Sequence, residues 1–384
     1  MRIAHVSVGA LPPVYSDGGG AVQRRVAELA AAQAAGGHDV TILSPGTDPL
    51  DGAPRAVPTR FLACRADGPL MHWEFLLRAR RALAAAPAPD IVHVHNEPEG
   101  AAVLAGIGRG IVLSFDNFHF RQRLGARLRR AYRSLLLRFD ILLPVSRYCA
   151  EAASAQWDLP ADRVQLLPNG VNTSQFLPQP QASATERRRL APSGDVLVYL
   201  GRICRQKGIH VLLDGFVQLR RRARRPVHLV LAGPIGQFDE RDRPEEDAAW
   251  RQAMDRAGAV YIGRVPEHRL AALLGMADVF VMPTVELEMQ GMAALEALAC
   301  GVPVVASDHG GLRETVPDAC GVRFATGSSA GLADAVLELL DDPRRRRTLG
   351  AGAMAHASGY AWPKIAVRAT DAYGAALRHR GQLA

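Results

Sequence analysis

Short apolar runs alternate with stretches of helical periodicity along most of the chain, and this alternation constrains the fold more than any other feature. The runs have strand length, and the stretch 21–36 between two of them is typical of an amphipathic helix. Such alternation indicates parallel sheets covered by helices on both faces. We expect strands at residues 2–8, 38–45, 59–64, 90–95, 110–115 and 141–146, and again at 195–202, 227–234, 259–265, 278–284 and 302–307.

The series of strands is interrupted at residues 173–194. This stretch is rich in proline, serine, glutamine and charge, a composition typical of a linker. The 384 residues also exceed what one hydrophobic core usually supports. We therefore predict an α/β protein of two Rossmann-like, doubly wound domains, at 1–172 and 195–362, joined by this linker. Because such domains bind ligands at the carboxyl ends of their strands, we expect a cleft between them.

Composition excludes several classes of protein. The sequence shows neither an apolar run of 18 residues nor a signal peptide, so we expect a cytoplasmic protein. The five cysteines are far apart in apolar contexts, which indicates reduced core residues and neither a disulfide frame nor a metal site. The net charge of +8 is carried almost wholly by arginine, since Lys207 and Lys364 are the two lysines. Nucleic-acid binding is not expected, because the basic stretches lack aromatic interleaving and a reading motif.

Two carboxylates stand out in the stretch ELEMQGMAALEALACGVPVVAS. Glu296 has apolar neighbours on every side, and burying its charge without a partner would cost several kcal/mol. Glu288 lies in the loop before the predicted helix, and helical side chains lean toward the amino terminus, so both carboxylates reach the same edge. Residue spacing leaves open whether Glu296 pairs with an arginine or with a ligand.

Cations and free amides are expected at neighbouring strand ends. In YLGRICRQKG, Arg202 and Lys207 follow Gly201 in a short loop between a strand and a helix, where they could bind a diphosphate or remain solvated surface charge. The first amides of the helix after the Glu288 loop would also favour an anion; they belong to Gly291, Met292 and Ala293. A second glycine-rich loop, SDGGGAVQ, contains Gly19 and Gly20 and is weaker evidence. Carboxylates beside cations suit a nucleotide sugar.

The stretch ELEMQGMAALEALACGVPVV resembles the E-x7-E signature of retaining glycosyltransferases with the GT-B fold, glycosyltransferase family 4. The resemblance extends over nearly the whole chain. Its further motifs are DGGGAVQRRVAELAAAQAAGGHDVTIL, DIVHVH, LLPNGVN, YLGRICRQKG, LAGP, YIGRV and ADVFVMPT. The resemblance implies two Rossmann-like domains facing a cleft and a closing helix at 363–384 that crosses back onto the first domain.

The resemblance also implies roles for single residues. The position of Glu296 binds the ribose diol, that of Glu288 faces the hydroxyls of the donor sugar, and those of Arg202 and Lys207 hold the diphosphate. The amides of Gly291 to Ala293 would meet the phosphates or the sugar, and those near Gly19 the diphosphate from the opposite domain.

The sequence departs from the family pattern at Asp116. Many relatives carry a histidine there, whereas this chain has His119 three residues later. Asp116 could accept a hydrogen bond from a sugar hydroxyl or stabilise a developing positive centre, or it could cap the following helix. The participation of His119 and the identity of the sugar are left open.

No D-x-D pair is present to hold a divalent metal, so the expected reaction needs no metal or other cofactor. We expect a retaining transfer of a hexose, by front-face displacement, from a nucleotide diphosphate donor to a hydroxyl of a small or lipid-linked acceptor. A UDP-sugar is the favoured donor, with GDP- and dTDP-sugars as alternatives. Other readings are a nucleotide-sugar epimerase or phosphorylase on a related fold, and a non-catalytic sugar-nucleotide binding protein. The basic helix at 121–139 is either a peripheral membrane contact or a solvated arginine face.

Overall fold

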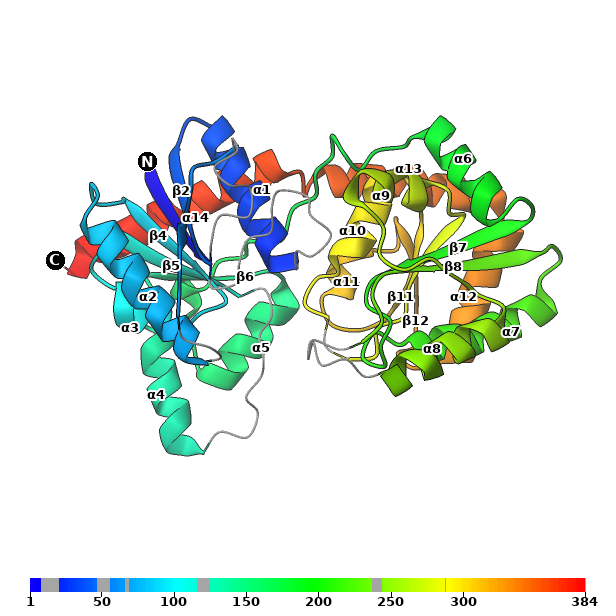
Figure 1. The fold of residues 1–384 in the computed structure, drawn as a ribbon, viewed down its shortest axis with the longest axis horizontal. Helices are drawn as coiled ribbons and strands as arrows, with labels where there is room; N and C mark the ends of the chain where they lie inside the picture. Colours follow the sequence, from blue (N-terminus) through cyan, green and yellow to red (C-terminus); the bar gives the residue numbers. More distant parts are fainter. Residues whose placement is uncertain are drawn as a thin grey trace. The chain divides into compact units, whose positions relative to one another are not determined.

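The computed structural model describes residues 1–7, 21–46, 56–65, 69–115, 125–236, 244–286 and 288–383. The chain divides into two compact units (Figure 1). The first comprises Met1–Gly170 together with Trp362–Ala384, and the second comprises Val171–Ala361.

The first unit is built on a parallel sheet of six strands in the order β3-β2-β1-β4-β5-β6. Helices α1 and α14 pack against each other and share a core with the sheet (Figure 1). The strands are β1 Arg2–Ser7, β2 Asp39–Pro45, β3 Thr59–Leu62, β4 Ile91–His95, β5 Gly110–Phe115 and β6 Ile141–Pro144. The helices are α1 Ala21–Ala35, α2 Pro69–Ala84, α3 Gly100–Leu104, α4 Ala126–Leu136, α5 Arg147–Trp157, the 3-10 turn η1 Ala161–Arg163 and α14 Trp362–Leu383.

The second unit repeats this plan with the strand order β12-β11-β10-β7-β8-β9. One core lies between the sheet and helices α9, α10 and α13, and another packs α7, α8 and α12 on the sheet. The strands are β7 Asp195–Leu200, β8 Val227–Ala232, β9 Val260–Tyr261, β10 Val279–Met282, β11 Val304–Ser307 and β12 Gly321–Phe324. The helices are α6 Pro180–Leu190, α7 Ile209–Arg222, α8 Pro244–Ala257, α9 Glu267–Gly275, α10 Met292–Ala299, α11 Leu312–Thr315, α12 Ser329–Asp341 and α13 Pro343–Ser358.

The predicted fold class is confirmed. Every predicted strand is present, although the one expected at 259–265 is reduced to β9, Val260–Tyr261. The central strands were the plainest in the sequence, because they are buried on both faces and form continuous apolar runs. Strand β12 escaped prediction, since GVRF is short, contains an arginine and is only partly buried at the edge of its sheet.

The segment 173–194, for which composition predicts a linker, contains helix α6 and belongs to the second unit. Arg187 donates to Met276 O, Gly194 O and the Asp278 carboxylate, and Glu186 pairs with Arg269. Polar anchors therefore attach this helix to its neighbours. Apolar periodicity cannot report such a helix, because the anchoring side chains are arginine and glutamate.

Each sheet has a topological switch point. There the chain adds strands on one side of the first strand and then continues with strands on its other side. Strand β1 lies between β2 and β4, and β7 lies between β8 and β10. In open parallel sheets ligands bind outside the carboxyl ends of the strands at this point. The loops that follow β1, β4, β7 and β10 are therefore the places to look for a site.

Candidate functional site

At the switch point of the second sheet, the loop after β7 contacts the loop after β10. The backbone amides of Val285 and Glu286 both donate to Gln206 O, at 3.1 and 3.3 Å. Gly208 has φ +72°, and a Cβ built there would lie 1.9 Å from Pro283 O. The backbones approach so closely that no side chain fits between them, and this contact sets the distance between the two loops.

Lys207 and Glu288 meet across these loops. Lys207 Nζ lies 2.5 Å from Glu288 Oε2, and the two side chains are 24% and 14% exposed. Both were candidates from the sequence, and the structure brings them together although 81 positions separate them. The carboxylate holds the ammonium group at the carboxyl edge of the sheet, where a phosphate oxygen could share it.

Arg202 lies in the same loop, two residues beyond the end of β7. Its carbonyl accepts a hydrogen bond from the Tyr199 hydroxyl at 2.7 Å, and Gly201 N donates to Ala232 O at 2.9 Å. Burial raises the pKa of Tyr199 well above its ordinary value, so the hydroxyl stays protonated and donates. Tyr199 thereby fixes the backbone that carries Arg202, a role that the apolar strand pattern concealed.

Helix α10 begins at the other side of the Glu288 loop. Gly291 precedes it with φ +89°, where a Cβ would lie 2.7 Å from Leu312 Cδ2, and Met292 and Ala293 form its half-buried first turn. Gly311 N donates to Glu288 O at 2.8 Å. The neighbouring segment thus holds the Glu288 loop and the first amides of the helix in place, as an anion site requires.

Glu296 is 4% exposed and lies in the second turn of α10. Burial raises the pKa of the Cys300 thiol to about 12, and the charge of Glu296 one turn away contributes. Ribose binding by this carboxylate stays a prediction. The remaining candidates, Gly19, Gly20, Asp116 and His119, lie outside the described residues.

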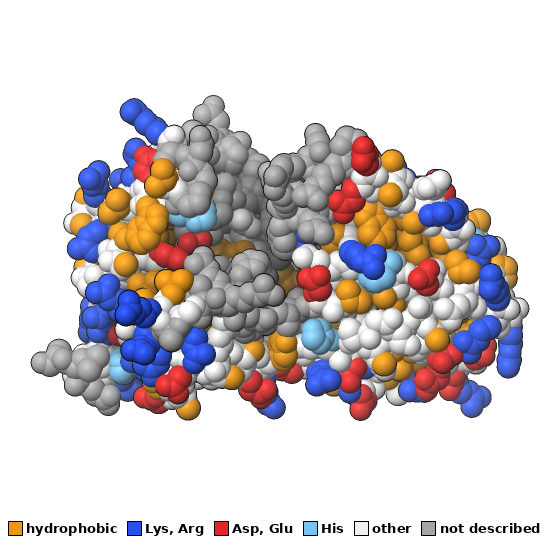
Figure 2. Space-filling model, turned by 90° about the horizontal axis from the view of Figure 1, so that it is seen from below, with side chains coloured by type: hydrophobic (Ala, Val, Ile, Leu, Met, Phe, Trp, Pro, Cys, Tyr) orange, Lys and Arg blue, Asp and Glu red, His pale blue; other side chains and the backbone are white. Residues whose placement is uncertain are grey.

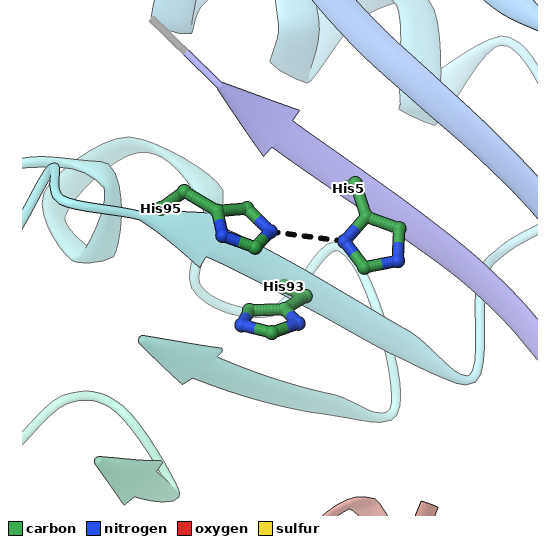
Figure 3. Close-up of side chains that lie close together, drawn as sticks. All are labelled: His5, His93 and His95. Atoms are coloured by element: carbon green, nitrogen blue, oxygen red, sulfur yellow. Dashed lines mark hydrogen bonds between the residues drawn. The ribbon is translucent and has the colours of Figure 1, made fainter. Parts of the chain in front are cut away.

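The first unit contains a polar cluster that sequence reasoning did not single out. His5 on β1 and His93 and His95 on β4 are fully buried under α1 and α14, and Figure 3 shows their rings close together. The available signal was the spacing of histidines two apart in DIVHVH, which places both on one face of a strand. Their side chains are the one group in the described part of the chain whose spacing could suit a metal ion.

Hydrogen bonds order the cluster. Gln33 Nε2 donates to the Tyr373 hydroxyl at 3.0 Å, which leaves Gln33 Oε1 to accept from His5 Nε2 at 2.7 Å. His5 Nδ1 is then the acceptor of His95 Nε2–H at 2.9 Å (Figure 3). Tyr373 in turn donates to His93 Nδ1 at 2.7 Å. This network ties β1 and β4 to α1 and to α14 from the far end of the chain.

Ring geometry decides against a metal centre in this arrangement. The rings of His93 and His95 are stacked, with centroids 4.1 Å apart and planes 24° apart. Because a metal lies in the plane of each imidazole that binds it, stacked rings direct their lone pairs side by side and not toward one point. Both nitrogens of His5 and of His93 are also engaged in hydrogen bonds. The cluster is therefore a neutral hydrogen-bonded core.

Protonation of this core is expected to destabilise the protein. Burial lowers the pKa of His5 to about 4, and it lowers the pKa values of His93 and His95 well below their ordinary value, with the charge of buried Arg25 adding to the effect. Unfolded histidines bind protons near pH 6.5, so stability is complete above that pH and falls as the pH drops toward 4. The lowered pKa of His5 alone corresponds to a loss of about 3 kcal/mol in the free energy of unfolding.

The measurement is a proton NMR titration of the histidine Cε1–H signals, assigned with single His→Gln variants. Signals of His5, His93 and His95 should not move between pH 8 and 5, whereas all histidines of the urea-unfolded chain titrate near 6.5. Titration of any of the three near pH 6.5 in the folded protein would contradict the neutral network.

Comparison with known proteins assigns the chain to a family. The model of the family "Glycosyltransferase Family 4" matches residues 18–175, and that of "Glycosyl transferases group 1" matches residues 183–356. Glycogen synthase of Mycobacterium tuberculosis is 30% identical in an alignment 417 positions long, which covers 100% of this chain and 96% of that protein. The chain belongs to glycosyltransferase family 4.

Other members of the family match over shorter segments. D-inositol 3-phosphate glycosyltransferase of Nocardia farcinica is 34% identical over 220 residues, 56% of this chain and 48% of that protein. The chain thus spans about half the length of the first curated relatives it matches.

Solved structures share the fold of this family 4 protein. The crystal structure of Anabaena HepE in complex with UDP and glucose has a TM-score of 0.78, with 18% identity over 97% of this chain and 99% of that chain. At this identity the likeness establishes the two-sheet GT-B architecture. In the described part of the chain, no helix combines the length and the apolar character needed to cross a membrane.

Proposed function

We propose that this family 4 protein is a retaining glycosyltransferase that moves a hexose from a nucleoside diphosphate to a hydroxyl acceptor. The observation that carries the proposal is the contact of Lys207 with Glu288 at the switch point of the second sheet, next to Arg202 and the start of α10. A cation for phosphate and a carboxylate for hydroxyls stand side by side there, as a sugar joined to a diphosphate requires.

Each group has a separate task in this proposal. Lys207, Arg202 and the first amides of α10 offset the charge of the diphosphate, which grows as the bond to the sugar breaks. Glu288 accepts hydrogen bonds from sugar hydroxyls and, through its charge, favours the positive character that develops on the sugar. Glu296 accepts from the ribose diol of the nucleotide.

The proposed reaction proceeds on one face of the sugar. The bond between the anomeric carbon and the diphosphate oxygen breaks, and the acceptor oxygen bonds to the same face of that carbon. The acceptor proton passes to the departing phosphate oxygen. Because the new bond forms on the face that the diphosphate leaves, the anomeric configuration is retained. Because Lys207, Arg202 and the helix amides supply the positive charge, no metal ion is needed in this proposal.

The donor is proposed to be a UDP-sugar, with GDP- and dTDP-sugars as alternatives. The named ligand of the HepE structure and the whole-length likeness to a glycogen synthase support a nucleotide-activated hexose. The names of the relatives include an inositol phosphate acceptor, which supports a hydroxyl of a small or lipid-linked polyol.

Peripheral membrane contact is proposed for a lipid-linked acceptor. Helix α4 exposes Arg127, Leu128, Arg129 and Arg130 in succession, and Leu128 is 54% exposed. Figure 2 shows basic and hydrophobic side chains next to one another on the left-hand unit, which is the first unit of Figure 1. Arginine beside exposed leucine suits an anionic lipid surface.

A donor and acceptor panel tests the proposal. Thermal shifts with UDP-, GDP- and dTDP-hexoses identify the donor, and mass spectrometry then detects transfer to D-inositol 3-phosphate, a maltooligosaccharide or phosphatidylinositol vesicles. We expect transfer to one acceptor class, with an unchanged rate in EDTA. Loss of transfer in EDTA, restored by manganese or magnesium, would overturn metal independence. Nucleotide release without a transfer product would instead favour an epimerase or phosphorylase.

A further inference from the structure

The short helix α11 and the residue before it pack against the backbone of the Glu288 loop. Gly311 N donates to Glu288 O at 2.8 Å, and a Cβ built on Gly311 would lie 1.8 Å from Met289 O. One residue further along the loop, the Thr315 hydroxyl donates to Gln290 O at 2.5 Å. Three successive carbonyl groups of the loop therefore lie against this one segment.

The Thr315 hydroxyl is buried at the end of α11, where it has a polar task. Thr315 is 1% exposed and Gln290 is 3% exposed, so the hydrogen bond between them is removed from water. The N–H of Thr315 donates to Gly311 O at 3.0 Å, which holds the residue in place. Because a buried carbonyl needs a donor, the hydroxyl fixes the direction of the Gln290 carbonyl.

The direction of this carbonyl sets that of the next N–H group. The peptide bond between Gln290 and Gly291 is trans, so its C=O and N–H point in opposite directions. The N–H of Gly291 is therefore directed away from Thr315 and α11. Gly291 is buried, and within the described part of the chain its N–H donates to no backbone carbonyl. It stands directly before the first turn of α10, among the amides that the proposed function gives to the diphosphate.

We propose that Thr315 is a positioning residue of the donor site, which directs the N–H of Gly291 at the distal phosphate of the nucleoside diphosphate. The inference rests on the proposed function, because it explains how the start of α10 keeps the geometry required there. Thr315 acts through the peptide between Gln290 and Gly291 and does not touch the ligand. Without the hydroxyl, this peptide turns to bring its carbonyl to another donor, and the N–H of Gly291 leaves the phosphate.

The N–H of Gly291 can be observed by itself, because Gln290–Gly291 is the one Gln–Gly pair in the sequence. The full chain, labelled with carbonyl-¹³C glutamine and ¹⁵N glycine, gives a single amide signal in a carbonyl-filtered NMR spectrum. UDP, GDP, ADP and dTDP are first compared by calorimetry, and the tightest binder is then titrated beside its monophosphate. The Gly291 signal of the wild type should move much further with the diphosphate, since the monophosphate lacks the distal phosphate.

Thr315→Val keeps the size of the side chain and removes its hydroxyl. We expect this variant to bind the diphosphate about tenfold more weakly, because the N–H of Gly291 no longer faces the phosphate. The affinity for the monophosphate should stay at the wild-type value, a selectivity that a general loss of structure would not produce. Thr315→Ser is the matched control, since it keeps the hydroxyl. Its diphosphate affinity and its Gly291 signal should follow those of the wild type.

Equal diphosphate affinities in the wild type and Thr315→Val would overturn the positioning role while the proposed function stands. Equal weakening of the diphosphate and the monophosphate would also overturn it, because the effect would not be confined to the distal phosphate. If circular dichroism shows that Thr315→Val does not fold, the wild-type titration decides, and a Gly291 signal that moves equally with both nucleotides overturns the inference. A wild type that binds none of the four diphosphates would overturn both proposals. Selective diphosphate binding without any sugar transfer to the acceptor panel would support the positioning role and overturn the proposed function.

Discussion

Replacing Lys207 with alanine is expected to lower the rate of sugar transfer by about ten- to hundredfold, as one charge-assisted hydrogen bond to phosphate is worth about 1.5–3 kcal/mol. The loss of rate should lie at the upper end of this range. Glu288 is only 14% exposed, and in the variant it faces the diphosphate without the ammonium group that lies 2.5 Å away. Single-turnover rates and calorimetry with the nucleoside diphosphate measure the two consequences.

Lys364 provides the control, since it is the other lysine of the chain and is exposed on α14. Lys364→Ala should transfer sugar at the wild-type rate. The double variant Lys207→Ala, Glu288→Gln should lose less transition-state stabilisation than the sum of the losses in the two single variants. The reason is that removing the charge of Glu288 relieves its repulsion of the diphosphate. Wild-type turnover in Lys207→Ala would remove this lysine from the donor site.

Gly208→Ala is expected to destabilise the second unit by about 3 kcal/mol or more and to abolish donor binding. The new Cβ would lie 1.9 Å from Pro283 O, and φ at this residue is +72°. Because the contact is with backbone, no side chain can move aside, and the loop that carries Lys207 must separate from the Glu288 loop. Urea unfolding monitored by circular dichroism, together with nucleotide calorimetry, measures both effects.

Gly263→Ala separates the clash from the backbone strain. Gly263 has φ +69°, close to that of Gly208, but a Cβ there would meet nothing within 4 Å. The free energy of unfolding of this variant should fall by only about 1 kcal/mol, and donor binding should be kept. Equal losses in the two variants would show that the approach to Pro283 does not hold the two loops together.

The residue types of the candidate donor site could be predicted from the chain, because they depend on side-chain chemistry and local position. A rare lysine at a strand end and a glutamate before a buried helix are visible without a structure, as are the strands, whose burial on both faces leaves continuous apolar runs. The cluster of His5, His93 and His95 also left a trace in the sequence, but alternate histidines in a strand carry no information about what covers them.

The sequence by itself determined the two-sheet α/β architecture and the residue types of the candidate donor site, since both follow from periodicity and side-chain chemistry over short stretches. Only the tertiary structure decided that Lys207 touches Glu288, that Tyr199 holds the carbonyl of Arg202 and that Glu97 lies against His72. It also decided that α6 is anchored by ion pairs within the second unit. The Lys207–Glu288, Glu97–His72 and α6 contacts join residues far apart in the chain. Their distances are set by strand order and by close backbone approaches such as that of Gly208 to Pro283. No local pattern in the sequence encodes either of these.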